Sequence, residues 1–422
     1  MKKTQLILIA LLICQMSMAQ SWYQQNSGTD STLDDVFFVN NDTGYACGWN
    51  TILKTTDGGT NWIPLSTGFV NYFLNVRFLN ADTGFVSGFA YGVILKTTDG
   101  GSTWANIGPN IPDKKTYGTW FTSADTGFMA IGDYNPPIFP TMCNSKILKT
   151  HNSGATWDTV YSSALWISFF SFPTHLVGYA TRNDCHILKT IDGGDSWTLS
   201  DSLGHYWMSG VSFLNKDTGF VGGGGCNMGS ALAQIWKTTD AGATWQPKFT
   251  STITDSINGG YRLFTVNANT AYNIGSSYDC SGTGGKLFKT MDGGTTWNKE
   301  LIPRDSLWSM YFTSENNGFA VGCNGAILKY GFPLSITNNI DNNYKITVYP
   351  IPVNDIMNIS VGNATGNVEV CIYDMIGRIY ENKSYEVTGL SIAVPVSYLT
   401  TGFYFFEIIN NGSVTRGKFS KQ

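Results

Sequence analysis

Short apolar segments bounded by polar turns fill most of this chain. The clearest is an eleven-residue segment that begins with strand-like Ile-Leu-Lys-Thr and ends in Trp, with Asp and Gly between them. It reads ILKTTDGGTNW at 52–62 and ILKTTDGGSTW at 94–104. Further copies start at residues 147, 187, 235 and 287, and a truncated ILKY starts at residue 327. Strand-rich repeats with starts 40–53 residues apart predict one β-propeller blade per repeat.

A second segment precedes each copy and consists of an aromatic strand, a polar turn and a Gly-aromatic or similar pair. It reads FFVNNDTGY at 37–45 and FTSENNGF at 312–319, and it occurs seven times in all. The seventh blade lacks its Trp strand, whereas Trp22 has no blade before it. We therefore expect an all-β fold with a seven-bladed propeller over residues 20–332, in which the strand of Trp22 pairs beside 327–329 and closes the ring.

The recurring segment looks like a hairpin turn. Thr97, Asp99, Gly101 and Trp104 resemble the Asp-box of sialidases and other propellers, S/T-x-D-x-G-x-T-W. Asp accepts hydrogen bonds from nearby backbone N–H groups, and Gly adopts the positive φ that such turns need. A ring of catalytic or metal-binding acids is the alternative, but each carboxylate is held in its own turn. The structural Asp-box positions are Asp57, Asp99, Asn152, Asp192, Asp240 and Asp292. Asn152 can form the same turn as Asp.

The N-terminus has the pattern of a secretory signal peptide at 1–19, with two Lys, an apolar run and a small-residue site ending at Ala19. Lipidation at Cys14 is the less favoured alternative. Only 13% of residues are charged, and the formal net charge is −4, or −6 without Lys2 and Lys3. This charge gives no reason to expect nucleic acid or an anionic membrane as a partner, and no later apolar run is long enough to span a bilayer.

Six cysteines fall in the propeller, and each is expected to follow strand 2 of a blade or to lie in the loop before strand 3. Since the destination is oxidising and these loops share one face of a propeller, disulfides between adjacent blades are expected. The predicted pairs are Cys143–Cys185, Cys226–Cys280 and Cys47–Cys323. Buried thiols are the equally weighted alternative. No spacing typical of a zinc site occurs, and we expect no metal and no cofactor.

The pattern changes after a polar linker at 333–343. Seven short strands follow in residues 344–422 and predict a small β-sandwich. The segment YPIP at 349–352, the segment with Asp374, Gly377 and Arg378, and the basic end resemble the type A sorting domain of the type IX secretion system of Bacteroidetes. Ile351 replaces the usual Asn. The resemblance implies the type IX machinery as partner of 344–422, passage through the periplasm, and release or attachment at the outer-membrane surface.

The propeller repeats resemble the photosystem II assembly factor family of oxygenic phototrophs and its bacterial relatives. D-T-G-[FY] followed by I-L-K-T-x-D-G-G-x-T-W carries this resemblance over the whole propeller. It implies a fold rather than a function. A photosynthetic role is not expected beside a sorting module. The same blades are also similar to xyloglucan-cleaving seven-bladed glycoside hydrolases and, more distantly, to sialidases.

The face opposite the Asp-boxes carries the loops of variable length, so a ligand is expected there. Residues entering the first strand of each blade are the ligand-face candidates: Asp34, Asp35, Asn75, Arg77, Tyr117, Trp120, Trp166, Trp207, Arg262 and Trp308. The alternative is that the aromatic members plug the channel and pack between blades. The favoured function is non-enzymatic binding of a glycan or protein. The alternatives are a glycoside hydrolase using Asp34 or Asp35 opposite Asp184, and a structural adhesin or spacer.

Overall fold

The computed structural model describes residues 21–133, 143–200, 203, 206–225, 233–251, 262–275, 280, 286–300, 302–303, 306–331, 348–350, 352–361, 366–374, 379–410 and 413–422. The expected signal peptide lies outside these residues, as do Cys226, Gly377 and Arg378. The chain divides into two compact units, one of which is Gln20–Gly331. The other contains the C-terminal sheets. Each unit is described by itself.

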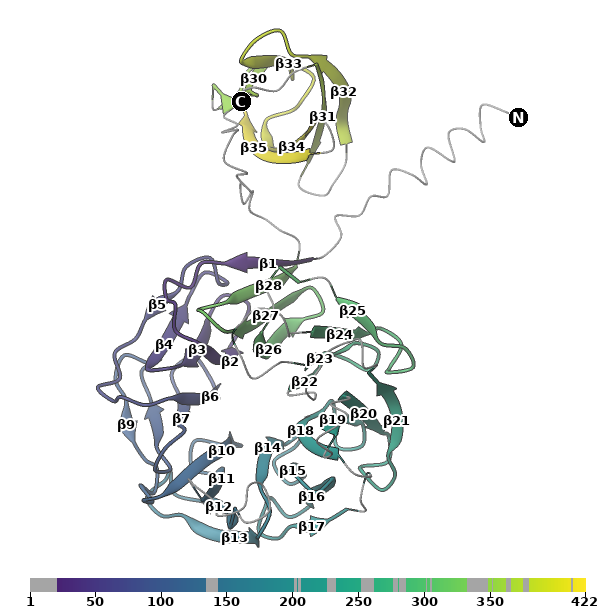
Figure 1. The fold of residues 1–422 in the computed structure, drawn as a ribbon. Coiled ribbons are helices and arrows are strands. Elements are labelled where there is room, and N and C mark those ends of the chain that lie inside the picture. The colour runs from purple at the N-terminus through teal and green to yellow at the C-terminus, as the bar shows by residue number, and fades with distance from the viewer. Residues whose placement is uncertain are drawn as a thin grey trace. The chain divides into compact units, whose positions relative to one another are not determined.

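Gln20–Gly331 contains seven four-stranded antiparallel sheets arranged as blades around a central channel (Figure 1). The innermost strands are β2 (Leu33–Phe38), β6 (Phe73–Phe78), β10 (Lys114–Phe121), β14 (Ile167–Ser171), β18 (Tyr206–Phe213), β22 (Arg262–Thr265) and β26 (Leu307–Ser314). The second strands are β3 (Gly44–Gly48), β7 (Gly84–Gly88), β11 (Gly127–Asp133), β15 (Gly178–Arg182), β19 (Gly219–Gly225), β23 (Ala271–Gly275) and β27 (Asn317–Gly322).

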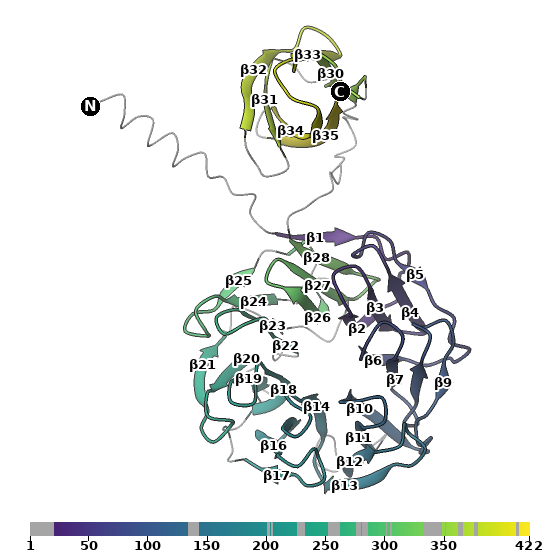
Figure 2. The same cartoon turned by 180° about the vertical axis from the view of Figure 1, so that it is seen from behind.

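The third and fourth strands lie progressively further from the channel, as the view from behind also shows (Figure 2). The third strands are β4 (Thr51–Thr55), β8 (Ile94–Thr97), β12 (Ser145–Thr150), β16 (His186–Thr190), β20 (Ala233–Thr238), β24 (Lys286–Thr290) and β28 (Ile327–Gly331). The outer strands are β5 (Ile63–Pro64), β9 (Ala105–Asn106), β13 (Asp158–Ser163), β17 (Thr198–Leu199), β21 (Gln246–Thr250), β25 (Asn298–Glu300) and β1 (Ser21–Gln25). The prediction of a seven-bladed all-β propeller is confirmed.

The N-terminal strand closes the ring as expected. β1 pairs antiparallel with β28, with Trp22 opposite Tyr330 and Gln25 opposite Ile327. The Trp22 side chain is buried, and its ring lies 5.2 Å from Tyr330 and 5.8 Å from Phe312, centroid to centroid. The last blade therefore takes its outer strand from the start of the chain, so β28 is paired and is not left as an open edge.

The Asp-box residues act within their own turns. Asp99 accepts hydrogen bonds from the Thr103 backbone N–H at 2.8 Å, the Thr103 hydroxyl at 2.6 Å and the Thr97 hydroxyl at 2.8 Å. These bonds lower the pKa of Asp99 to about 2. Gly101 adopts a φ of +91°, which favours glycine. In the third copy Asn152 accepts the equivalent bond from the Thr156 N–H at 2.9 Å, so this copy keeps the turn.

The lysine of the repeat, for which we had predicted no role, links neighbouring blades. Lys54 donates to the Gly100 carbonyl in the Asp-box turn of the next blade at 2.8 Å. Lys329 of the seventh blade donates to the Gly58 carbonyl of the first, also at 2.8 Å. Each such contact satisfies a turn carbonyl with a charged donor. The repeated segment thus builds one hairpin and stabilises the next.

The C-terminal unit has two sheets. One contains β29 (Val348–Tyr349), β30 (Ile356–Ser360) and β33 (Ser391–Pro395), and the other contains β31 (Asn367–Asp374), β32 (Ile379–Glu386), β34 (Gly402–Asn410) and β35 (Ser413–Lys421). Buried side chains from both sheets, among them Met357, Val394, Ile372 and Phe406, form one core. The alternation of apolar and polar residues along β31 and β33 produces this two-layer packing.

The disulfide predictions are wrong. Cys280 is bonded to Cys323, which joins the sixth and seventh blades and rules out both Cys226–Cys280 and Cys47–Cys323. Cys47 instead lies within β3, with its thiol buried in the apolar cluster between blades one and two. Cys143 and Cys185 are not bonded to each other either. The Cys185 side chain packs with Met208 of the fifth blade rather than toward the third.

Candidate functional site

A recurring bulge in the innermost strands determines which side chains face the channel. The pairing register shifts between Leu33 and Asp35 in β2, and at the equivalent place in β6, β10, β14, β18 and β26. A bulge inserts one extra residue and turns the side chains around it in new directions. Asp34 is the extra residue in β2, and Tyr117 and Trp308 occupy the same place in β10 and β26.

Two rings of residues, each with one residue from every blade, line a cavity of about 240 Å³ in the channel. The ring nearer the start of the inner strands consists of Asp35, Asn75, Gly118, Phe169, Gly210, Arg262 and Ser309. The second ring, two residues further along each strand, consists of Phe37, Arg77, Trp120, Ser171, Ser212, Phe264 and Tyr311. Alternation along a strand explains the spacing, since every second residue faces the same side.

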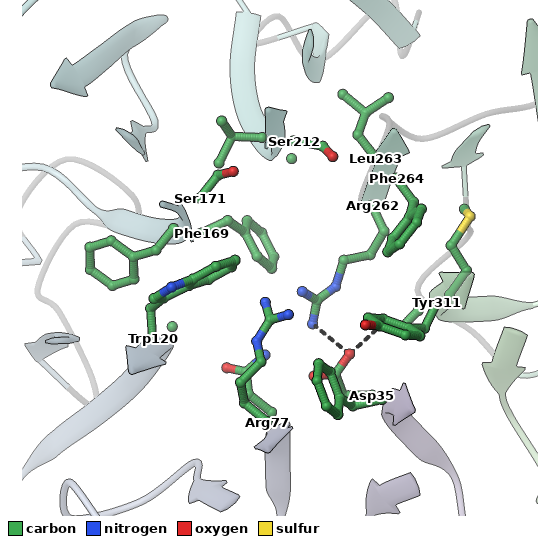
Figure 3. Close-up of a pocket in the computed structure, with 18 of the residues that line it drawn as sticks. Asp35, Arg77, Trp120, Phe169, Ser171, Ser212, Arg262, Leu263, Phe264 and Tyr311 are labelled. Atoms are coloured by element: carbon green, nitrogen blue, oxygen red, sulfur yellow. Dashed lines mark hydrogen bonds and ion pairs between the residues drawn. The ribbon is translucent and has the colours of Figure 1, made fainter. Parts of the chain in front are cut away.

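Two guanidinium groups and one carboxylate face this cavity. The Arg77 guanidinium lies 3.9 Å from the Trp120 ring centroid and 5.4 Å from that of Phe37. The Arg262 guanidinium lies 4.6 Å from the Phe169 centroid, and its Nη2 is 3.9 Å from Asp35 Oδ1. Figure 3 shows both groups pointing into the channel. Burial lowers the pKa of Arg77, an effect that Asp35 opposes.

Asp35 is already engaged within the protein. Its Oδ1 accepts a hydrogen bond from the Ser309 hydroxyl at 2.5 Å, and its Oδ2 accepts one from the Val76 N–H at 3.1 Å. These bonds connect the first blade to the seventh and second blades. Asp35 can therefore neutralise one of the two arginines, and the lining carries a net positive charge.

Five of the ten candidate residues line the cavity: Asp35, Asn75, Arg77, Trp120 and Arg262. The bulge and the ends of the strands direct the side chains of other candidates away from the cavity. Tyr117 packs on Trp166 at 4.7 Å between ring centroids, and the Trp308 indole N–H donates to Cys323 Sγ at 3.2 Å. The Trp207 side chain lies outside the described residues. Sequence reasoning missed Phe169 and Tyr311, although their places in the blade repeat could have indicated them.

The two carboxylates proposed to oppose each other in a hydrolase are both held by neighbours. Asp34 accepts a hydrogen bond from the Tyr72 hydroxyl at 2.8 Å, and burial raises its pKa to about 7. Asp184 is paired with both Nε and Nη2 of Arg182, at 2.7 and 2.6 Å. Burial opposes ionisation of Asp184, but the bonds from Arg182 outweigh it and lower the pKa.

Among the residues that the structure describes, no group of three or more His, Cys, Asp or Glu side chains could hold a metal ion. That same part of the chain contains no helix with the length and apolarity needed to cross a membrane.

The fold and its repeats define the class of this molecule as an Asp-box seven-bladed propeller joined to a β-sandwich. The family model described as photosynthesis system II assembly factor YCF48 matches residues 14–161, and that of the secretion system C-terminal sorting domain matches residues 347–422. The chain therefore consists of a YCF48/HCF136-like BNR propeller and a C-terminal type IX secretion sorting domain. This sorting domain implies interaction with the type IX machinery, and secretion or attachment to the cell surface.

A similar protein and two similar solved structures are consistent with this assignment. The chloroplastic photosystem II stability/assembly factor HCF136 of Cyanidioschyzon merolae (strain NIES-3377 / 10D) is 24% identical over 76% of this chain and 77% of its own. The solved structure of YCF48 bound to D1 peptide shares 20% identity, with a TM-score of 0.56 over 74% of this chain and 97% of that one. The GH74 enzyme of Niastella koreensis shares 16% identity, with a TM-score of 0.57 over 94% and 74% of the two chains. These two structural likenesses show the fold alone.

Proposed function

We propose that this protein is a non-enzymatic binding propeller, displayed at or released from the outer-membrane surface, whose channel receives a carboxylate-bearing end of a protein ligand. The observation that carries the proposal is the pair Arg77 and Arg262 facing one cavity, in which Asp35 is the one acidic side chain among the described residues. Both guanidinium groups are partly buried, and such cations attract an anionic group more strongly than exposed ones because less water competes for them.

The size of the cavity limits what can enter. At about 240 Å³ it is smaller than the roughly 300–1,000 Å³ pockets that enclose drug-sized ligands. It has room for a terminal group and not for a folded segment. The aromatic rings of Phe37, Trp120 and Phe169 around the arginines suit the apolar part of a peptide residue next to its carboxylate. The solved relative bound to D1 peptide supports a peptide as the ligand class.

The lining also supports a non-enzymatic role. Glycoside hydrolysis usually needs two carboxyl groups on either side of the bond that is cut. Among the described residues of the cavity, Asp35 is the one acidic side chain, and it is bonded to Ser309, Val76 and Arg262. Asp34 and Asp184 are engaged by Tyr72 and Arg182.

The route to the surface follows from the two ends of the chain. We infer that the leader at 1–19 directs the chain to the periplasm, and that 347–422 then directs it across the outer membrane. Removal of 347–422 should leave the propeller in the periplasm.

An array of short synthetic peptides with free or amidated C-termini tests the binding proposal. We expect a subset of peptides to bind only with a free carboxylate, and Arg77→Met to weaken that binding about tenfold or more, because a hydrogen bond to a charged group contributes about 1.5–3 kcal/mol. Lys216→Met, which removes an exposed cation on a turn, is the matched control. The proposal would be overturned if neither amidation of the peptide nor Arg77→Met weakened binding, or if the purified chain hydrolysed xyloglucan.

A further inference from the structure

A run of three aromatic side chains spans the first and second blades on the face opposite the Asp-box turns. Trp49 lies in the turn between β3 and β4, Tyr72 just before β6, and Phe89 just after β7. The ring centroids of Trp49 and Tyr72 are 5.3 Å apart, and those of Tyr72 and Phe89 are 6.0 Å apart. We call these three residues the aromatic ladder. None of them belongs to the channel lining, and the candidates from the sequence did not include them.

The ladder borders an exposed apolar surface. Trp49 is 63% exposed, although Trp is highly buried on average. Val70, two residues before Tyr72, is 87% exposed, and Tyr91, two residues after Phe89, is 53% exposed. Exposed apolar side chains that occur singly need no explanation, but here three of them lie in or close in sequence to a set of contacting aromatic rings, which points to a binding surface.

The backbone holds this surface in a fixed shape. Trp49 and Tyr72 form an isolated β-bridge, as do Ala90 and Lys115. The Trp49 N–H donates to the Thr32 carbonyl at 3.0 Å. The rings are therefore positioned before any ligand arrives, which lowers the entropy lost on binding.

These same backbone bonds argue against an extended peptide. The Asn50 N–H donates to Asn71, the Phe89 N–H to Tyr72, and the Tyr91 N–H to Lys114. A peptide that binds by adding a strand needs unpaired backbone groups along an edge. Here those N–H groups are used within the protein, so recognition depends on the ring faces.

The low charge of this surface further restricts the class of ligand that it can bind. The exposed residues in and beside the ladder, Trp49, Asn50, Val70 and Tyr91, are uncharged. Lys115 lies over the Phe89 ring with its Nζ 4.9 Å from the centroid, and burial lowers its pKa. Stacking platforms for single-stranded nucleic acid come with a strongly basic groove, which one such lysine does not provide.

We propose that the aromatic ladder is a binding surface for a neutral polysaccharide, whose sugar rings stack on Trp49 and extend toward Phe89. The apolar faces of sugar rings suit aromatic side chains, and the ring spacing is comparable with the length of one sugar unit. The Tyr72 hydroxyl donates a hydrogen bond to Asp34 Oδ1 at 2.8 Å, which fixes the central ring. This surface is separate from the channel and does not depend on the peptide proposal.

Affinity electrophoresis of the full secreted chain, in gels that contain xyloglucan, mixed-linkage β-glucan or polygalacturonate, tests the proposal. We expect retardation by at least one of the two neutral polymers and not by the acidic one. Trp49→Ala should weaken binding about tenfold, equivalent to about 1.4 kcal/mol, and Trp49→Tyr should restore most of it. Met291→Ala, at a 69% exposed apolar residue in an Asp-box turn, is the matched control and should bind normally.

Migration unaffected by either neutral polymer would overturn the proposal. So would retardation that Trp49→Ala and Met291→Ala leave equally strong, or retardation by polygalacturonate alone. Arg77→Met should keep its polysaccharide retardation, which separates this surface from the channel. Loss of retardation in Arg77→Met would place the sugar in the channel and contradict the ladder.

Discussion

Asp34 and Asp35 are neighbours in the sequence, but the bulge in β2 gives them different surroundings. Asp35 faces the channel and Arg262, whereas Asp34 turns toward Tyr72. Burial raises the pKa of Asp34 from 3.8 to about 7. The folded protein thus holds a proton on Asp34 that the unfolded chain releases above pH 4. Stability contributed by this group is present below about pH 4, falls as the pH rises to about 7, and stays low above that.

Asp34→Asn should therefore raise stability at pH 8 and leave it nearly unchanged at pH 4, since Asn keeps an acceptor for Tyr72 and carries no charge. A rise of the pKa from 3.8 to about 7 corresponds to about 4 kcal/mol of stability. We expect a gain of about 2 kcal/mol, because solvent reaches the partly exposed Asp34 side chain and screens the effect. Urea unfolding at both pH values measures the effect. Asp30→Asn, at an exposed carboxylate, is the control. An equal gain at pH 4 and pH 8 would contradict the assigned cause.

The Asp-box hairpin is a separate structural element whose Asp can be tested against a natural replacement. Asp99→Asn should be tolerated, because Asn152 makes the same bond to the backbone N–H four residues on. Asp99→Ala should lower the melting temperature, because the Thr103 N–H and hydroxyl then lose their shared acceptor. Calorimetry of the two variants measures this difference in melting temperature. Equal melting temperatures would mean that the side chain does not stabilise the turn.

The elements show what the sequence could and could not predict. Local turn chemistry predicted every Asp-box hairpin, since Asp, Gly and Trp at fixed spacing leave few alternatives. The bulges were not predicted, because one extra residue in the inner strand leaves no distinctive local pattern. This explains why Asp35 and Trp120 line the channel while Tyr117 and Trp308 pack elsewhere. The contact of Lys54 with the next turn was also missed, because it depends on the distance between blades.

At the scale of the whole molecule, repeat counting predicted the ring but not its covalent link. The cysteines were correctly placed on neighbouring blades, yet partner choice depends on which side of a blade each thiol faces. Cys47 is buried between blades, whereas Cys280 and Cys323 have Cα atoms 5.5 Å apart. Such a distance is set by loop paths that neither spacing nor composition contains.

Closure by β1 makes the integrity of the whole ring depend on a five-residue strand. Removal of 21–25 would expose β28, whose unpaired backbone groups could then pair with another chain. We expect this truncated protein to associate with rising concentration in analytical ultracentrifugation and to lose stability. Trp62→Ala, which empties a similarly buried site beside Phe38, should cost about 3–5 kcal/mol but remain monomeric, since it opens no edge. A truncated protein that stays monomeric at every concentration, with an unchanged unfolding midpoint, would show that the ring does not need its N-terminal strand.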